Sequence, residues 1–120
     1  MSYWGYHLRV DAAGCDLTKV SSVDYVRNYN DSLLSLIEMK SMGAPWIEDC
    51  GPEDRPDLCG ITVLQPIETS SISAHFCNLS GDAYLDVFSC KPFEDDAVVT
   101  HFRDWFGPQK VRYDFTVRQA

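Results

Sequence analysis

The chain has 120 residues and a formal net charge of −8, with 18 acidic and 10 basic side chains. This length is enough for one domain with a hydrophobic core, and the negative charge argues against binding to nucleic acid or to an anionic membrane surface. No apolar run approaches the ~20 residues that a membrane-spanning helix needs, and the first ten residues lack the pattern of a signal peptide. We therefore expect a single domain over residues 1–120, located in the cytoplasm.

The cysteines and histidines indicate neither a disulfide framework nor a metal site. Five cysteines are present and none belongs to a C-x-x-C pair, a pattern typical of free thiols in a reducing compartment. A zinc site requires clustered cysteine and histidine ligands, whereas the three histidines, His7, His75 and His101, are scattered along the chain. We therefore expect no bound metal.

The first third of the chain predicts a strand and then a helix. Residues 3–10 are expected to form the strand. Ser21 or Ser22 can cap the helix, because a serine hydroxyl accepts a hydrogen bond from a free backbone N–H of the first turn. Residues 43–45 contain a glycine and a proline that end it. The apolar stripe of this helix comprises Val23, Val26, Leu33, Leu34, Ile37 and Met42.

The middle of the chain predicts two short strands separated by a loop. Residues 46–48 and residues 61–64 have the composition of strands. Residues 50–58 combine glycine, proline and charged side chains, which is typical of a surface loop or of a mobile lid. Pro66 has no N–H to donate to a sheet, so we expect it to interrupt the second strand.

The last part of the chain predicts a hairpin, a helix and a final strand. Residues 71–77 and 83–89 read as strands, and the sequence NLSGD between them has turn chemistry. A helix is expected after Pro92, with acidic residues in its first turn, and residues 107–108 end it. Residues 110–117 alternate as a strand. The expected buried face of the helix comprises Ala97, Val98, Phe102, Trp105 and Phe106.

The resulting order of elements, β-α-β-β-β-β-α-β, indicates the fold class. Tight turns join the central strands, so these strands are expected to pair in an antiparallel sheet. Two amphipathic helices must bury their apolar faces against that sheet. The sequence therefore predicts an α+β two-layer sandwich, with a mainly antiparallel sheet and two helices on one face.

Three chemically active side chains fall in the segment from residue 68 to residue 90. His75 belongs to the first of its two expected strands, Ser70 directly precedes that strand and Cys90 directly follows the second. Pairing of those strands can bring Ser70 and His75 near Cys90. An uncharged nucleophile beside a base is typical of acyl chemistry.

This segment resembles the processing and catalytic region of the small, prokaryotic-type S-adenosylmethionine decarboxylases. In that family a histidine follows the processing serine by five residues, and an Asp-Leu-Phe-Thr-Cys-like strand ends twenty residues after the serine. Ser70, His75 and Cys90 have this spacing, and Asp86 and Phe88 occupy the matching strand positions.

The resemblance extends to both ends of the chain. The sequence GYHL at residues 5–8, followed by Cys-Asp at residues 15–16, is similar to the opening strand and turn of the family. The sequence KVR at residues 110–112 is similar to its last strand. Residues 48–58 match poorly.

The resemblance implies a self-made cofactor. The hydroxyl of Ser70 would attack the carbonyl of Thr69, and the chain would split there into residues 1–69 and 70–120, leaving a pyruvoyl group derived from Ser70. This group would form a Schiff base with the amine of S-adenosylmethionine and take up electrons during decarboxylation. His75 would assist self-cleavage, and Cys90 would return a proton to the substrate carbon. The resemblance also implies a homodimer with active sites between subunits and a role in spermidine biosynthesis.

Some positions depart from the family pattern. The residue before the processing serine is usually glutamate, but here it is Thr69, and Glu68 stands one place earlier. A second serine, Ser71, leaves the cleavage register open by one position; Ser70 preserves the spacing without gaps. The strand serine that precedes a glycine in the family has only Cys59 as a counterpart.

Two other functions stay open at the level of sequence. The chain can be an unprocessed, non-catalytic relative that binds a ligand or pairs with an active subunit. It can also be a pyruvoyl decarboxylase for another amino acid, such as ornithine or arginine. The substrate-binding residues are not identified by the sequence.

Overall fold

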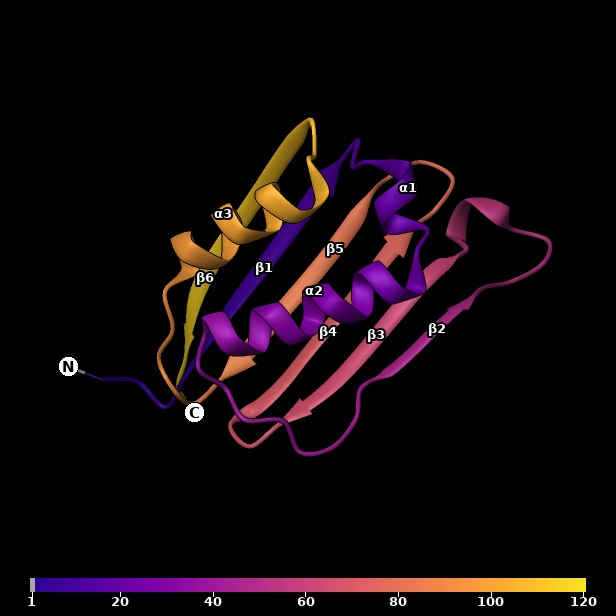
Figure 1. Ribbon diagram of the computed structural model, residues 1–120. Coiled ribbons are helices and arrows are strands. Elements are labelled where there is room, and N and C mark those ends of the chain that lie inside the picture. Colours follow the sequence, from indigo (N-terminus) through magenta and orange to yellow (C-terminus); the bar gives the residue numbers. More distant parts are fainter. Residues whose placement is uncertain (1) are drawn as a thin grey trace.

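In the computed structural model, which describes residues 2–120, six strands form one antiparallel sheet. Their order across the sheet is β2-β3-β4-β5-β1-β6 (Figure 1). The strands are β1 (Gly5–Ala13), β2 (Trp46–Cys50), β3 (Gly60–Ile67), β4 (Ser70–Cys77), β5 (Ala83–Ser89) and β6 (Lys110–Arg118). The helices are α1 (Leu17–Val20), α2 (Val23–Leu36) and α3 (Asp95–Phe106), with a 3-10 turn, η1 (Pro56–Leu58).

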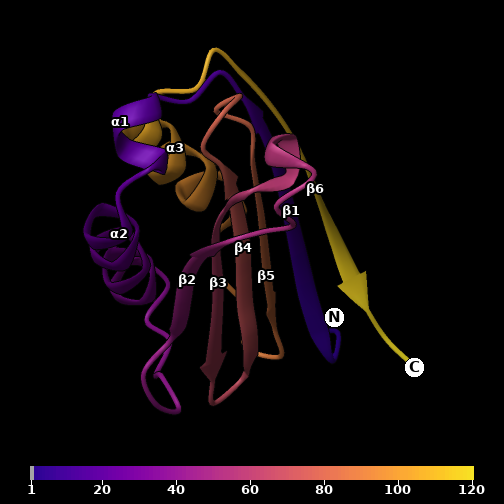
Figure 2. The same cartoon turned by 90° about the vertical axis from the view of Figure 1, so that its right-hand side faces the viewer.

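Within residues 2–120, α1, α2 and α3 all lie on one face of the sheet, and the other face, called the helix-free face here, carries no α-helix (Figure 2). Strand side chains alternate between the two faces, and those on the helix side form the core with α2 and α3. This arrangement confirms the predicted α+β sandwich. Among residues 2–120, no helix has the length and apolar character needed to cross a membrane. The fully buried large core side chains include Leu8, Leu33, Ile61, Phe76, Leu85, Phe102 and Phe106.

The first helical region differs from the prediction at both ends. Ser22 is the N-cap of α2, and its hydroxyl accepts a 3.1 Å hydrogen bond from the Tyr25 N–H. The helix ends at Leu36, because Glu38 turns the chain with a φ of 54°. The predicted continuation to Met42 is wrong, and the Met42 side chain is 64% exposed. A separate short helix, α1, precedes α2 and was not predicted.

Strand β3 continues through Pro66 as far as Ile67, so the predicted interruption is wrong. Ile67 pairs with Ser70 across a two-residue turn, and Pro66 pairs with Ser71. The closing pair of such a hairpin exchanges hydrogen bonds and the next pair does not. The nitrogen of Pro66 therefore points away from β4, and its missing N–H costs the β3–β4 ladder nothing.

The C-terminal elements agree closely with expectation. Helix α3 begins after the N-cap Glu94 and ends at Gly107, whose φ of 56° is the left-handed conformation that glycine adopts readily. Its buried side chains are Val98, Val99, Phe102 and Phe106. The final strand pairs with β1, so residues from the two ends of the chain lie side by side.

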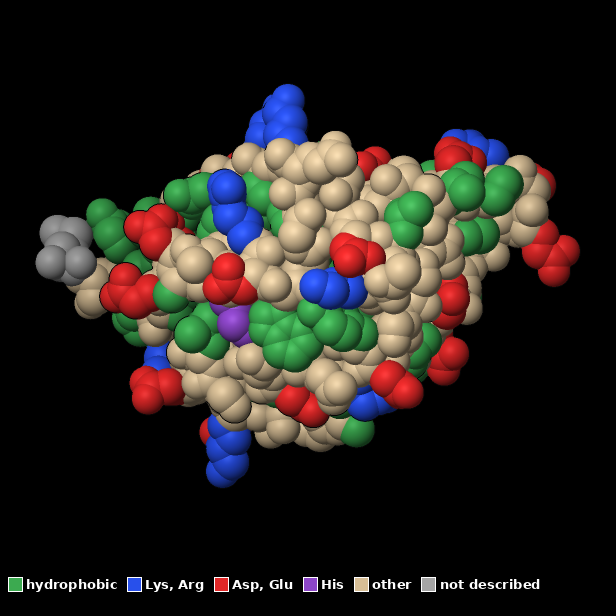
Figure 3. Space-filling view, turned by 45° about the horizontal axis from the view of Figure 1, so that its top comes forward, with side chains coloured by type: hydrophobic (Ala, Val, Ile, Leu, Met, Phe, Trp, Pro, Cys, Tyr) green, Lys and Arg blue, Asp and Glu red, His purple; other side chains and the backbone are tan. Residues whose placement is uncertain are grey.

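The helix-free face of the sheet carries exposed apolar and charged side chains. Leu64 is 51% exposed, and its cross-strand partner Trp46 and the β5 residue Tyr84 are exposed as well. Arg9 and Asp114 form a bidentate ion pair on this face, with a shortest N–O distance of 2.6 Å. On the face drawn in Figure 3, by contrast, acidic and basic side chains are scattered and the hydrophobic ones form small separate patches.

Candidate active site

Ser70 begins strand β4 immediately after the turn formed by residues 68–69. Its φ is 153°, in a region that residues with a side chain rarely adopt. This torsion lies about the bond between the Ser70 nitrogen and Cα, and it sets how the Ser70 side chain is directed relative to the Thr69 carbonyl. The backbone is thus unusual at the predicted cleavage position, whereas Ser71, the other candidate, has no positive φ.

The carbonyl oxygen of Thr69 is hydrogen-bonded to the residue that directly follows β5, the strand next to β4. The backbone N–H of Cys90 donates a 3.0 Å hydrogen bond to the Thr69 oxygen. Ser70 pairs with Ser89 in the β4–β5 ladder, so the end of β5 lies directly beside the turn. An N–H aimed at a carbonyl oxygen can stabilise the negative charge that develops there when a nucleophile attacks.

The side chains around this contact form a buried chain of hydrogen bonds that sequence reasoning did not identify. Ser89 is fully buried, and its hydroxyl donates to Thr69 Oγ1 at 2.8 Å. It also accepts a 3.0 Å hydrogen bond from the Lys91 N–H. The Thr69 hydroxyl in turn lies 3.2 Å from the sulfur of Met39. The threonine that replaces the family glutamate is therefore directed inward.

His75 does not lie near Ser70 and Cys90, which corrects the prediction that one hairpin brings all three together. A strand rises about 3.3 Å per residue, so five residues place His75 about 16 Å along β4 from Ser70. The turn that joins β4 to β5 lies at the His75 end of the hairpin, whereas Ser70 and Cys90 lie at the other end.

Both ring nitrogens of His75 have partners on the helix-free side of the sheet. Nδ1 lies 2.8 Å from Thr62 Oγ1, and Nε2 lies 3.1 Å from the carbonyl oxygen of Leu58. Since a carbonyl only accepts, Nε2 carries a proton, and in the neutral ring Nδ1 accepts from the Thr62 hydroxyl. The loop of residues 50–58 therefore folds over His75 through its η1 turn.

The cysteines differ sharply in environment. Cys90 is exposed and follows the buried end of β5, whereas Cys15 and Cys77 are buried. Burial raises the pKa of the Cys15 thiol to about 11 and also raises the pKa of Cys77. Protein-bound thiols exchange protons near neutral pH only when their pKa lies within reach, so neither buried thiol is suited to proton transfer.

The family model for S-adenosylmethionine decarboxylase matches residues 6–119. The chain belongs to this family. A crystal structure of the adenosylmethionine decarboxylase from Aquifex aeolicus VF5 superposes with a TM-score of 0.83 and 19% sequence identity, covering 100% of this chain and 94% of that chain. This likeness confirms the fold. No curated protein sequence matches the chain.

Two residues from the segments that resemble motifs of the S-adenosylmethionine decarboxylase family are in direct contact. His7, from the opening strand, and Asp86, from the strand that ends at Cys90, lie 2.9 Å apart between Nε2 and Oδ1. The His7 ring also meets the edge of Phe88. These residues come from neighbouring strands, β1 and β5, and sequence alone did not reveal that the strands pair.

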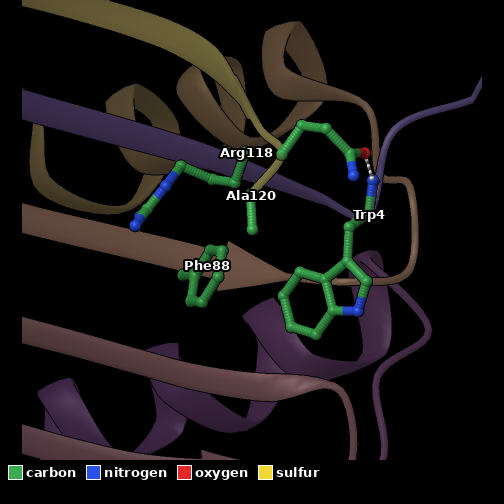
Figure 4. A pocket seen from close by; sticks show the side chains of 5 residues that line it. Trp4, Phe88, Arg118 and Ala120 are labelled. Carbon is green, nitrogen blue, oxygen red and sulfur yellow. Dashed lines mark hydrogen bonds between the residues drawn. The ribbon is translucent and has the colours of Figure 1, made fainter.

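A pocket of about 420 Å³ opens beside the end of β5, on the side of the sheet away from the helices (Figure 4). The Trp4 and Phe88 rings form its apolar walls, with centroids 5.9 Å apart. The guanidinium of Arg118 lies 4.9 Å above the Phe88 ring, and Gln119 Oε1 accepts a 3.0 Å hydrogen bond from the backbone N–H of Trp4. Phe88 belongs to β5 and precedes Cys90, the predicted proton donor, by two residues in the sequence.

Within residues 2–120, no three His, Cys, Asp or Glu side chains gather closely enough to hold a metal ion.

Proposed function

We propose that the chain is a pyruvoyl-dependent S-adenosylmethionine decarboxylase that cuts itself between Thr69 and Ser70, giving fragments 1–69 and 70–120. The observation that carries the proposal is the strained Ser70 backbone next to a Thr69 carbonyl that already accepts the Cys90 N–H. A distorted peptide at a turn, with a donor on its oxygen and a hydroxyl on its next residue, suits an internal acyl shift.

The cleavage follows from the chemistry of these two residues. Ser70 Oγ bonds to the Thr69 carbonyl carbon and loses its proton, the Thr69–Ser70 amide bond breaks, and the freed nitrogen takes up a proton to give an ester. Loss of the Ser70 α-proton then breaks the Cβ–Oγ bond and releases the Thr69 carboxylate. Water replaces the nitrogen of the remaining dehydroalanine, ammonia leaves, and a pyruvoyl group blocks the new N-terminus.

The position of Ser70 suits the use of this group in decarboxylation. Once formed, the pyruvoyl group supplies a carbonyl that accepts the electrons released when a bound amino acid loses carbon dioxide. Cys90 directly follows the neighbouring strand β5, and its exposed thiol can return a proton to the substrate carbon. The decarboxylated product would supply aminopropyl groups for spermidine synthesis.

The pocket beside Phe88 favours S-adenosylmethionine over a basic amino acid. The flat faces of Trp4 and Phe88 can stack against a planar ring such as adenine. Ornithine and arginine lack a planar heterocycle of this kind, so the aromatic surface offers them no matching contact. We therefore assign the pocket to the adenosyl part of the substrate.

We also propose that the active unit is a homodimer that uses the helix-free faces. Within one chain, His75 lies too far from Ser70 to act on its proton. A second copy laid across the helix-free face in the opposite direction would bring its His75 toward the Ser70 end. The exposed Leu64 and Trp46 give this face apolar surface to bury.

Intact-mass measurement of the purified protein tests the proposal most directly. We expect two fragments, the first ending at Thr69 and the second beginning with a pyruvoyl group, while Ser70→Ala stays whole. A fragment boundary one residue later would move the nucleophile to Ser71. If the wild-type chain stays full length after long incubation, the enzyme proposal fails and the chain is an unprocessed binding or partner subunit.

A further inference from the structure

We propose that Ser89 is a positioning residue for self-cleavage: through its buried hydroxyl it aligns the Thr69 carbonyl with the Cys90 N–H. This inference rests on the proposed self-cleavage. It concerns a residue that lies neither at the scissile bond nor among the candidate catalytic side chains.

The hydrogen bonds of Ser89 form a chain with one direction. A hydroxyl has a single proton, and the Ser89 hydroxyl has two acceptors within reach, Thr69 Oγ1 at 2.8 Å and the Met39 sulfur at 3.6 Å. The shorter contact to oxygen is the stronger one, so the proton is directed to Thr69. The Thr69 proton then points to the Met39 sulfur, 3.2 Å away. The Ser89 oxygen also accepts a 3.0 Å hydrogen bond from the backbone N–H of Lys91. Every polar atom of this buried chain has a partner, so the arrangement is well defined.

Ser89 is therefore hydrogen-bonded to the residues on both sides of the contact between the Thr69 carbonyl and the Cys90 N–H. Its bond to Thr69 fixes the side chain of the residue whose carbonyl is to be attacked. Its bond from Lys91 fixes the backbone just after Cys90, and the Cys90 N–H lies between these two anchors. A carbonyl carbon becomes tetrahedral when Ser70 attacks, and its oxygen gains charge that the Cys90 N–H stabilises only if the alignment is kept.

The side chain of Lys91 connects the end of β5 to the segment that follows α2. The Lys91 ammonium group donates a 2.7 Å hydrogen bond to the Glu38 carbonyl, and Met39 follows Glu38 directly. The segment after α2 thus meets the end of β5 at two points, because the Met39 sulfur also lies 3.6 Å from the Ser89 hydroxyl. The turn of residues 68–69 is fixed against this junction, and the Glu68 N–H also donates to the Lys40 carbonyl.

The test is a time course of cleavage for Ser89→Ala, Ser89→Thr and Thr69→Val, followed by intact mass at a temperature well below each unfolding transition. Loss of one hydrogen bond should slow cleavage by about tenfold in Ser89→Ala and Thr69→Val, whereas Ser89→Thr keeps the hydroxyl and should stay near the wild-type rate. The double variant should be no slower than either single variant, because both act through one bond. Ser73→Ala, a serine replacement in β4 outside this chain of bonds, is the matched control.

Hydroxylamine separates positioning from a general loss of structure. It cleaves esters, so it releases a C-terminal fragment beginning with unmodified Ser70 wherever the ester accumulates. If Ser89 acts on the first step, Ser89→Ala should stay slow in hydroxylamine while its unfolding transition shows a folded protein. If Ser89→Ala cleaves as fast as the wild type, this inference alone is overturned. It is also overturned if Ser89→Ala is slowed only in proportion to its loss of folded protein. A wild-type chain that never cleaves would overturn the proposed function and this inference together.

Discussion

Ser70 and His75 share strand β4 but lie about 16 Å apart along it, at opposite ends of the β4–β5 hairpin. A general base must come within hydrogen-bonding distance of the proton that it removes. If His75 takes part in self-cleavage, it must therefore act on Ser70 of a second copy.

This relationship predicts complementation between inactive variants. Ser70→Ala cannot cleave, and we expect His75→Ala to cleave slowly because its partner lacks the base. In a mixed dimer, the His75→Ala chain has an intact Ser70 and receives the His75 of the Ser70→Ala chain. Intact mass of co-expressed, differently tagged chains should show cleavage of the His75→Ala chain only. Rapid cleavage of the His75→Ala homodimer would exclude this role for His75.

Cys90 should separate turnover from self-cleavage. Cys90→Ala keeps the backbone N–H that binds the Thr69 carbonyl, so we expect it to cleave at least partly. Without the thiol, protonation of the substrate carbon fails, and most turnover should be lost while fragments with an alanine-like N-terminus accumulate. Mass spectrometry and carbon dioxide release measure both effects. Cys77→Ala should be much milder, and equal turnover of wild type and Cys90→Ala would move the donor elsewhere.

The helix-free face should carry the dimer contact. We expect light scattering at micromolar concentration to give a dimer mass for the wild type. Leu64→Asp places a charge among the exposed apolar side chains of that face, on β3, and should shift the mass to that of a monomer. Leu79→Asp is the matched control, because Leu79 is 64% exposed but lies in the turn after β4. A dimer that survives Leu64→Asp would place the contact on another surface.

His101 should give the fold a pH dependence in mildly acidic solution. Burial lowers the pKa of His101 below its ordinary value of 6.5, although Asp104 opposes the shift. The folded protein then binds fewer protons than the unfolded chain, so the free energy of unfolding falls as the pH drops below 6.5 and levels off below the folded-state pKa. Denaturant unfolding at pH 7.5 and pH 5.0 should show a larger loss for wild type than for His101→Gln. Equal losses would mean that His101 is not the cause.

The strands were largely predictable because alternation and turn chemistry are local. Pairing of residues 71–77 with residues 83–89 brought the ends of β4 and β5 together as expected, which put Cys90 beside the Thr69–Ser70 bond. The position of His75 was wrong for a physical reason. Five residues advance about 16 Å along a strand, so residues five apart in one strand cannot share a site.

Other features depend on contacts between distant segments. The bond between Ser89 and Thr69 requires the register of β4 and β5, and the contact of His7 with Asp86 requires β1 to lie beside β5. The four residues of α1 form less than two turns of apolar pattern, which is too short for periodicity to identify. The exit from α2 places Glu38 in the left-handed conformation, with the Met39 N–H donating to the Leu34 carbonyl, and glutamate is not a residue that signals such a helix end.

The strand order has a consequence for the state of the protein after cleavage. A cut before Ser70 assigns β1, β2 and β3 to one fragment and β4, β5 and β6 to the other. Because the order is β2-β3-β4-β5-β1-β6, the two polypeptides alternate across the sheet and meet along three ladders, β3–β4, β5–β1 and β1–β6. The cut would leave an interwoven heterodimer that behaves as one particle in gel filtration, and its pieces would part only when a denaturant opens the whole sheet.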